Sequence, residues 1–132
     1  MLMQINRVRA LHGVAPVYPS VKLQVAANHH SDDMMMRDYF AHTSPTGSSV
    51  YSRIVGSGFV NGYSWVGGET LAWGTGTLAT VRGTVNAWLA SPDHRAIMLS
   101  PTYRWIGISR TCGTYEGHAS ACVWTADWVR RS

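Results

Sequence analysis

The spacing of apolar residues predicts two helices in the first third of the chain. Near the N-terminus, apolar side chains recur every three residues, at Leu2, Ile5, Val8 and Leu11. Gly13 follows this run as a helix stop, so we expect a short helix there. A second amphipathic run follows Pro19 and Ser20 and carries its stripe on Leu23, Ala27, His30 and Met34. We expect this helix to end at His42, because the Ser-Pro turn that comes next cannot extend it.

Three further elements are predicted before the last third of the chain. Ser48 and Ser49 can cap a helix over residues 50–55, which glycines terminate. Residues 59–74 are rich in glycine and aromatic residues, which indicates an irregular wall or a short strand. Residues 77–90 predict a helix that is capped by its first threonine and has its core stripe at Leu78, Val81, Val85 and Trp88.

The last third changes to a β pattern. Residues 105–112 and 122–129 flank the Gly-rich turn 113–117, so we expect an antiparallel hairpin. Cys112 and Cys122 lie on either side of this turn, where a disulfide would add about 2.5–3 kcal/mol in the chain-entropy model. A reduced pair in a cytosolic protein also fits two cysteines, and their spacing matches no zinc knuckle. We favour the disulfide and therefore an oxidising compartment.

The composition describes a single domain over residues 1–132. Its 45% apolar content, with six Trp and six Tyr, is enough for a packed core. The formal net charge is +4, but the basic residues are scattered, which is typical of a solvated surface and not of a nucleic-acid footprint. A weak attraction to an anionic surface such as a cell wall is compatible with this charge. Neither a membrane span nor a signal peptide is visible.

Three residues carry candidate chemistry, and each also has a structural interpretation. His42 stands at the predicted helix end, where functional side chains are often presented, but it could also cap the last carbonyls. Glu69 is one of only two glutamates and is either a partly buried carboxylate with a partner or an exposed loop acid. His94 follows Ser91 and Pro92, which predict a helix start. The helix dipole favours a neutral ring there, suited to a metal or a general base, although a bond to local backbone fits equally well.

Common catalytic motifs are absent. The chain has no Gly-x-Ser-x-Gly elbow, Walker loop, Gly-x-Gly-x-x-Gly fingerprint or His-Glu-x-x-His helix. Ser44 and Ser91 lie near the histidines, but their spacing singles out neither as a nucleophile. Cysteine catalysis is excluded if both thiols are paired. The remaining candidate chemistry rests on His42, Glu69 and His94.

The order of several short motifs is more specific than any one of them. The most informative are Tyr39-Phe-Ala-His42, Gly68-Glu69-Thr-Leu-Ala-Trp-Gly74 and Trp88-Leu-Ala-Ser-Pro-Asp-His94-Arg. With Ile5-Asn-Arg-Val-Arg and Ile106-Gly-Ile108 they cover nearly the whole chain in order. On these residues the chain resembles the bacterial branch of the CAP superfamily, also called SCP-like. That superfamily includes cysteine-rich secretory proteins, insect antigen 5 and plant pathogenesis-related proteins.

The resemblance implies an α+β fold, a three-layer α-β-α sandwich with a central, mostly antiparallel sheet. It also implies secretion and a cleft lined by His42, Glu69 and His94, in which the two histidines would hold a divalent metal, zinc above all. Such a site would leave an open position for water. The chain also departs from eukaryotic relatives: Ser91 stands where they have a second glutamate, Thr70 where they have asparagine, and their Gly-His-Tyr-Thr-Gln motif is absent.

These expectations lead to one functional hypothesis and two alternatives. We expect a secreted, monomeric domain whose cleft binds a small molecule, a peptide or a cell-wall ligand, with zinc optionally held by His42 and His94. In the first alternative, a metal-dependent hydrolase of peptides or cell-wall polymer, Glu69 would act as general base to a metal-bound water. The second alternative is a structural or adhesive module that uses exposed Trp and Tyr residues.

Overall fold

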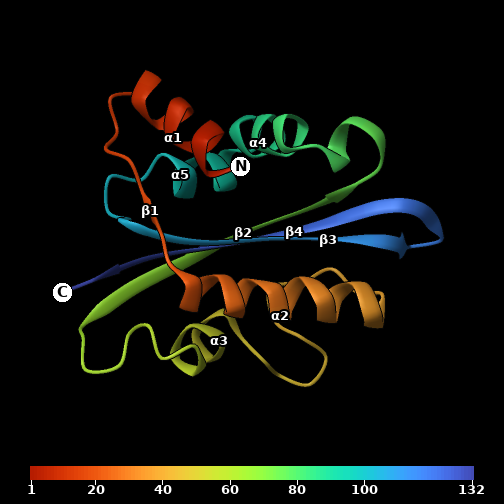
Figure 1. Cartoon of the computed structure of the whole chain (residues 1–132), viewed down its shortest axis with the longest axis horizontal. Coiled ribbons are helices and arrows are strands. Elements are labelled where there is room, and N and C mark those ends of the chain that lie inside the picture. Colours follow the sequence, from red (N-terminus) through yellow and green to blue (C-terminus); the bar gives the residue numbers. More distant parts are fainter.

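The chain folds into three layers, with a sheet between two layers of helices (Figure 1). The computed structural model describes residues 1–132. One helical layer consists of α1 (Leu2–Leu11), α4 (Val81–Ala90) and α5 (Pro92–Met98), and the other of α2 (Val21–Arg37) and α3 (Val50–Gly56). A short 3₁₀ helix, η1 (Gly76–Ala79), precedes α4. This arrangement confirms the predicted α-β-α sandwich.

The sheet has four strands in the order β1-β3-β4-β2. Their bounds are Tyr18–Pro19 for β1, Trp65–Gly74 for β2, Trp105–Tyr115 for β3 and His118–Arg131 for β4. β1 is parallel to β3 and the other pairs are antiparallel, so the sheet is mostly antiparallel, as expected. β4 lies in the interior of the sheet, whereas β2 forms one edge and pairs only with β4.

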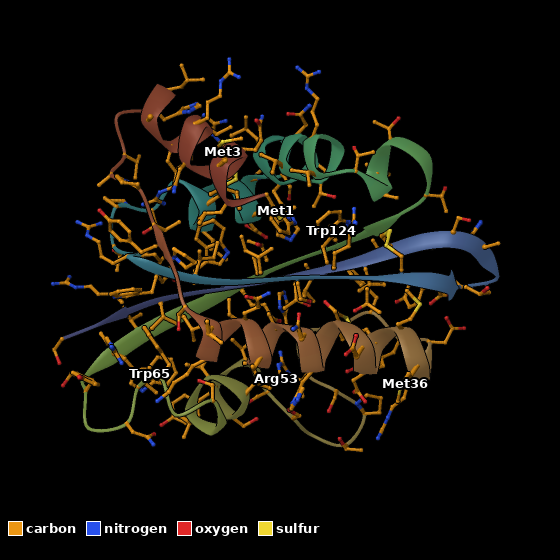
Figure 2. All side chains as sticks on the ribbon, in the orientation of Figure 1. Met1, Met3, Met36, Arg53, Trp65 and Trp124 are labelled. Carbon is orange, nitrogen blue, oxygen red and sulfur yellow. A yellow bond between two sulfur atoms is a disulfide. The ribbon has the colours of Figure 1, made fainter.

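Alternate side chains of β4 contribute to the apolar cores on both faces of the sheet. Trp124 and Trp128 belong to the core under α1, α4 and α5, whereas Val129 packs toward α2 and α3. Figure 2 shows Trp124 and Arg53 on opposite sides of the sheet. Every residue over 121–129 is buried, so β4 is the strand around which both cores form.

A buried arginine joins α1 to the connection between α5 and β3. The Arg9 side chain is fully buried and donates hydrogen bonds to the carbonyls of Met98, Ser100 and Tyr103. The bounds of α1 are as predicted, but Leu11, expected on the core stripe, is 76% exposed. A three-residue spacing drifts around a helix that has about 3.6 residues per turn, so the last member of the run leaves the buried face.

The longest helix, α2, ends earlier than predicted. It stops at Arg37 because Asp38 adopts the left-handed conformation, with φ of 55°. The prediction that the helix reaches His42 is therefore wrong, and His42 lies in the loop that follows. Neither α2 nor any other helix has the length and apolar character of a membrane span.

Two other predicted boundaries are also wrong, whereas α3 begins where its caps predicted. Thr80, and not Thr77, caps α4, because its hydroxyl accepts a hydrogen bond from the Gly83 amide at 3.1 Å. The residues before it form η1. The segment 59–74, expected to hold at most a short strand, contains the ten residues of β2. α3 is capped by Ser49, as expected.

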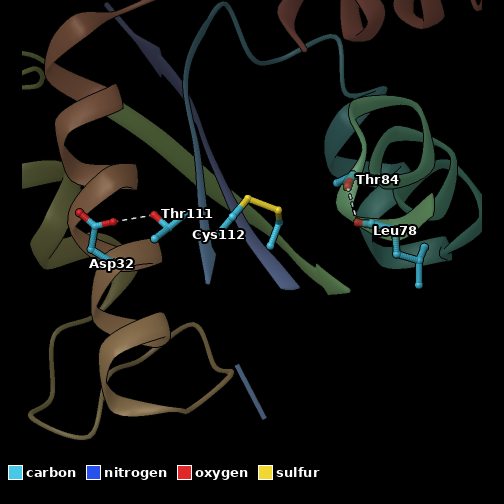
Figure 3. Close-up of a disulfide and its surroundings, with 6 residues drawn as sticks. Asp32, Leu78, Thr84, Thr111 and Cys112 are labelled. Atoms are coloured by element: carbon cyan, nitrogen blue, oxygen red, sulfur yellow. Dashed lines mark hydrogen bonds between the residues drawn. A yellow bond between two sulfur atoms is a disulfide. The ribbon is translucent and has the colours of Figure 1, made fainter. Parts of the chain in front are cut away.

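β3 and β4 form the expected hairpin, which is longer than predicted. A two-residue turn closes it at Glu116 and Gly117, whose φ values of 49° and 75° are those of a type I′ turn. Cys112 and Cys122 face each other across the hairpin and form a disulfide, which confirms the predicted pairing (Figure 3). The neighbouring threonine donates a hydrogen bond to Asp32, which also ties this end of the hairpin to α2.

Candidate functional site

His42 and Glu69 meet where the loop after α2 passes β2. Glu69 Oε1 accepts a hydrogen bond from His42 Nδ1 at 2.8 Å. The Glu69 side chain is completely buried, whereas that of His42 is 55% exposed. This bond orients the imidazole, with Nδ1 toward the carboxylate and Nε2 as the ring nitrogen that the carboxylate does not engage. His42 is thus an exposed side chain with a buried anchor.

Arg53 of α3 completes this anchor. Its Nη2 donates to Glu69 Oε2 at 2.8 Å and to the His42 carbonyl at 2.7 Å. Its Nη1 donates to the Ser48 carbonyl at 2.8 Å. The Arg53 side chain is only 7% exposed, and Figure 2 shows it in the layer of α2 and α3. One guanidinium therefore ties both ends of the loop 42–48 to the carboxylate beneath it.

His30 of α2 supports the same loop. Its Nε2 donates to the carbonyl of Ala41, the residue before His42, at 2.8 Å, and lies 3.8 Å from Glu69 Oε1. Burial lowers the pKa of His30 by more than the charge of Glu69 raises it. The ring is therefore neutral at neutral pH and acts as a hydrogen-bond donor.

His94 reaches the same region from the opposite helical layer. Ser91 is the N-cap residue of α5, as predicted, but its hydroxyl lies 3.0 Å from His94 Nδ1 and makes no capping bond to the helix. Burial lowers the pKa of His94, and the charge of His42 lowers it further. The structure thus joins His42 directly to Glu69, whereas the side-chain hydrogen bond of His94 is to Ser91. Phe40, from the loop that carries His42, lines one hollow together with His94.

Asp127 is a second buried carboxyl group beside Glu69. The two residues face each other across β2 and β4 and are 1% and 4% exposed, respectively. No neighbouring donor bonds to either oxygen of Asp127, and the bond that this carboxyl group can make is to Glu69, by donating its own proton. Burial and the charge of Glu69 raise the pKa of Asp127 well above its usual value. Burial also acts on Glu69, but the bond from His42 and the charge of Arg53 outweigh it and lower the pKa of Glu69. Glu69 is therefore the ionised member of the pair.

Comparison with known proteins assigns this arrangement to a family. The model of the CAP family, described as the cysteine-rich secretory protein family, matches residues 2–127. The chain belongs to the CAP family. This match confirms the resemblance inferred from the order of the sequence motifs.

Several bacterial proteins are similar to this CAP domain in sequence or in structure. It is 32% identical over 124 residues to the uncharacterised protein YkwD of Bacillus subtilis strain 168, a match that covers 94% of this chain and 43% of that protein. The chain thus spans less than half the length of this relative. An outer surface protein of Borrelia burgdorferi has a similar structure, with a TM-score of 0.81 and 19% identity over 99% of this chain and 90% of that one. An extracellular protein of Bacillus anthracis that contains an SCP domain gives a TM-score of 0.78 and 24% identity over 98% of this chain and 40% of that one. At these identities the two structures establish the fold alone.

The side chains of the CAP domain fit a metal site only in part. A histidine whose Nδ1 donates to a carboxylate is typical of metal ligands, and His42 has this arrangement. His94, with its lowered pKa, offers a neutral imidazole. Catalytic zinc uses three protein ligands, and no group of three or more His, Cys, Asp or Glu side chains is placed to hold a metal ion. Glu69 is not available as the third ligand, because both its oxygens are engaged.

Sequence reasoning missed three members of this site: Arg53, His30 and Asp127. Arg53 belongs to none of the sequence motifs described above, and the apolar spacing of the second helix places His30 in a core stripe. Buried polar side chains need partners, so a histidine on a core stripe is a signal that other polar groups lie nearby. Asp127 carries a similar signal, because it is the only charged residue in the buried run 121–129.

Proposed function

We propose that this CAP domain binds a ligand at His42, with His94 of the opposite helical layer as a second contact. The observation that carries the proposal is the anchor of His42, an exposed side chain held by Glu69 and backed by Arg53 and His30. Three buried polar groups under one exposed ring are typical of a site whose geometry is fixed before the ligand arrives. Neutral imidazoles offer acceptor nitrogens to a hydrogen-bond donor or to a metal ion.

A divalent metal ion is an optional part of this proposal. His42 and His94 would hold it, and water or the bound ligand would supply the remaining positions. Zinc is the best candidate, because it accepts imidazole ligands readily. When bound, the ion would supply positive charge that attracts carboxylate or phosphate groups of a ligand.

The contacts of Glu69 favour binding over hydrolysis. A general base must come within hydrogen-bond reach of the water that it activates. Glu69 is fully buried, its oxygens are engaged by His42 and Arg53, and its pKa is lowered, all of which make it a poor base. A metal-dependent hydrolase would need both another base and a third metal ligand. The hydrolase and the adhesive module stay predictions.

An extracellular location is also part of the proposal. The disulfide between Cys112 and Cys122 supports it, because such bonds persist in oxidising compartments. Two proteins of similar structure are described as an outer surface protein and an extracellular protein. The net charge of +4 is compatible with attraction to an anionic cell wall.

Zinc titration by calorimetry tests the histidine site. Metal-free wild type at neutral pH should bind zinc one-to-one, and the His42→Ala/His94→Ala variant should not. The matched control is His12→Ala/His29→Ala, which removes two exposed histidines outside the site and should bind as wild type does. Equal loss in both variants would indicate unspecific histidine binding and refute the site. If the wild type does not bind zinc, the metal part of the proposal is refuted, and a ligand that binds without a metal ion is what remains of it.

A further inference from the structure

Two adjoining hollows lie at the start of β2, near the end of the molecule where Figure 2 labels Trp65. The first, of about 490 Å³, is lined mainly by apolar side chains and includes Tyr51 of α3. The second, of about 320 Å³, is more polar and includes Ser64 and Arg130. Trp65 and Val66 line both hollows, so the two form one continuous depression. Both volumes lie within the range of about 300–1,000 Å³ that is typical of small-ligand sites.

An exposed aromatic pair forms one wall of the first hollow. The ring centres of Tyr51 and Trp65 lie 5.1 Å apart, and Tyr51 is 66% exposed. Tyr63, two residues before Trp65, is 46% exposed. Exposed aromatic side chains that gather beside a hollow mark an interaction surface, because leaving them in water has a cost that a ligand can remove. The flat rings favour a ligand that has a flat apolar face of its own.

Basic side chains without an acidic partner lie at the same end of the molecule. The Arg104 amide donates to the carbonyl of Val129 at 3.1 Å, which places it beside the end of β4. Lys22 Nζ donates to the Gly58 carbonyl at 3.3 Å. The guanidinium of Arg131 lies 4.0 Å from the ring centre of Phe59, the residue after Gly58. The basic residues of this end, none of which belongs to an ion pair, are Lys22, Arg104, Arg130 and Arg131.

Most acidic residues lie at the opposite end of the sheet. The Glu116 amide, in the β3–β4 turn, donates to Asp38 at 2.7 Å, and Asp32 and Asp33 lie in the second half of α2. Figure 1 shows the β3–β4 turn and the start of β2 at opposite ends of the molecule. No acidic residue lines either hollow. This separation of charge along the molecule attracts an anionic ligand to the start of β2.

We infer that the start of β2 binds an acidic saccharide, a ligand whose sugar rings carry carboxylate groups. A pyranose ring has an apolar face of C–H groups that fits the rings of Tyr51 and Trp65. Its hydroxyl groups fit the second hollow, where Ser64 both donates and accepts hydrogen bonds. Its carboxylates fit Arg130, whose planar guanidinium can bind both oxygens. An alkyl chain would use the aromatic wall alone, and a simple anion would use the arginine alone.

NMR on ¹⁵N-labelled protein in EDTA tests this inference, with trigalacturonic acid as the probe. The indole N–H signal of Trp65 and the amide signals of residues 65–67 should shift when it binds. Two comparison ligands separate the sugar rings from the charge: cellotriose is a neutral trisaccharide, and triglutamate is an anion without sugar rings. Each should bind about tenfold more weakly than trigalacturonic acid or worse. Raising the salt from about 0.05 M to about 0.5 M should weaken trigalacturonic acid and leave cellotriose unchanged.

Matched protein variants test the two halves of the site. Tyr51→Ala should weaken trigalacturonic acid about tenfold, because the loss of about 55 Å² of apolar contact corresponds to that factor. Tyr51→Phe keeps the ring and should bind within about twofold of wild type. Tyr18→Ala is the control, because Tyr18 is 54% exposed on β1, at the other edge of the sheet. Arg130→Gln should weaken binding about fivefold and reduce its salt dependence, whereas Arg82→Gln, on the exposed face of α4, should do neither.

The saccharide site is independent of the proposed histidine site. Neither His42 nor His94 lines the two hollows. The His42→Ala/His94→Ala variant should therefore lose zinc binding and keep the affinity for trigalacturonic acid, so failure of one site is distinguishable from failure of the other.

Four results would overturn the inference. Equal binding of triglutamate would show a surface that attracts any anion, and tighter binding of a thymidine oligonucleotide would show a site for single-stranded nucleic acid. Signal shifts that do not include residues 65–67 would place the saccharide elsewhere. An absence of binding at millimolar trigalacturonic acid would show that the aromatic pair and the basic residues do not form a saccharide site.

Discussion

The Glu69→Gln substitution should destabilise the domain less than the loss of a buried anion normally does, because Asp127 can take over the charge. Glu69 is the anion for the buried Arg53 guanidinium. Its charge also raises the pKa of Asp127, which lies directly across the β2–β4 pair. With Glu69 neutral this repulsion disappears, and Asp127 can ionise beside Arg53.

The expected changes in the free energy of unfolding follow if either carboxyl group can serve as the anion beside Arg53. Asp127→Asn replaces a protonated carboxyl group by a neutral amide and should change the free energy of unfolding by about 1 kcal/mol or less. Glu69→Gln weakens two charge-assisted hydrogen bonds and should cost about 2 kcal/mol. The double variant leaves Arg53 buried without any anion, which typically costs about 3–5 kcal/mol. With the central values of these ranges, the double variant should lose about 1.5 kcal/mol more than the two single variants together.

Urea unfolding of the four proteins at neutral pH measures this coupling. With an m-value of about 2 kcal/mol per molar, each 2 kcal/mol lowers the midpoint by about 1 M. The carboxyl ¹³C signal of Asp127 should report a protonated group in the wild type and an ionised group in Glu69→Gln. Additivity of the two substitutions within about 0.5 kcal/mol would refute the exchange of charge between the two carboxyl groups.

Two further predictions concern pH and the disulfide. The pKa values of His30 and His94 are lowered from 6.5 in the folded protein, so the unfolded chain binds more protons just below that pH and stability is lost as the pH falls through the folded values. The raised pKa of Asp127 has the opposite effect on stability, because the folded protein then binds more protons than the unfolded chain. The urea midpoints of wild type and His30→Gln, compared from about pH 8 to about pH 5, isolate the contribution of His30. If the midpoint depends on pH equally in both proteins, His30 does not contribute to the pH dependence of stability. Replacing Cys112 and Cys122 by alanine should lower the free energy of unfolding by up to about 2.5–3 kcal/mol, reduction of the wild type should do the same, and an unchanged midpoint would contradict the prediction.

Elements with a local signal were predictable, and those that depend on distant partners were not. Ser49 caps α3 through contacts within one turn, and the β-rich runs around Glu116 and Gly117 identify a hairpin. The end of α2 depends on Asp38 in a left-handed conformation, which its residue type only weakly favours. The glycines of β2 disfavour a strand in the sequence. Pairing with β4, which is buried over residues 121–129, nevertheless makes that segment a strand.

The residues of the candidate site likewise divide into those with a local sequence signal and those that depend on distant partners. His42, Glu69 and His94 stand out in the sequence, and the structure places His42 in contact with Glu69. The sequence offers no means of pairing Arg53 with Glu69, because the contact joins α3 to a strand and depends on how both pack. The choice between an exposed acid and a buried one with a partner was open for Glu69, and the structure shows the second.

The position of β4 has a consequence for the order in which the fold can assemble during synthesis. β4 follows every other element in the sequence, yet it lies between β3 and β2 in the sheet. Residues 75–117 separate the end of β2 from the start of β4, its only strand partner. A nascent chain therefore carries β2 unpaired until β4 leaves the ribosome, and the sheet closes in one late step.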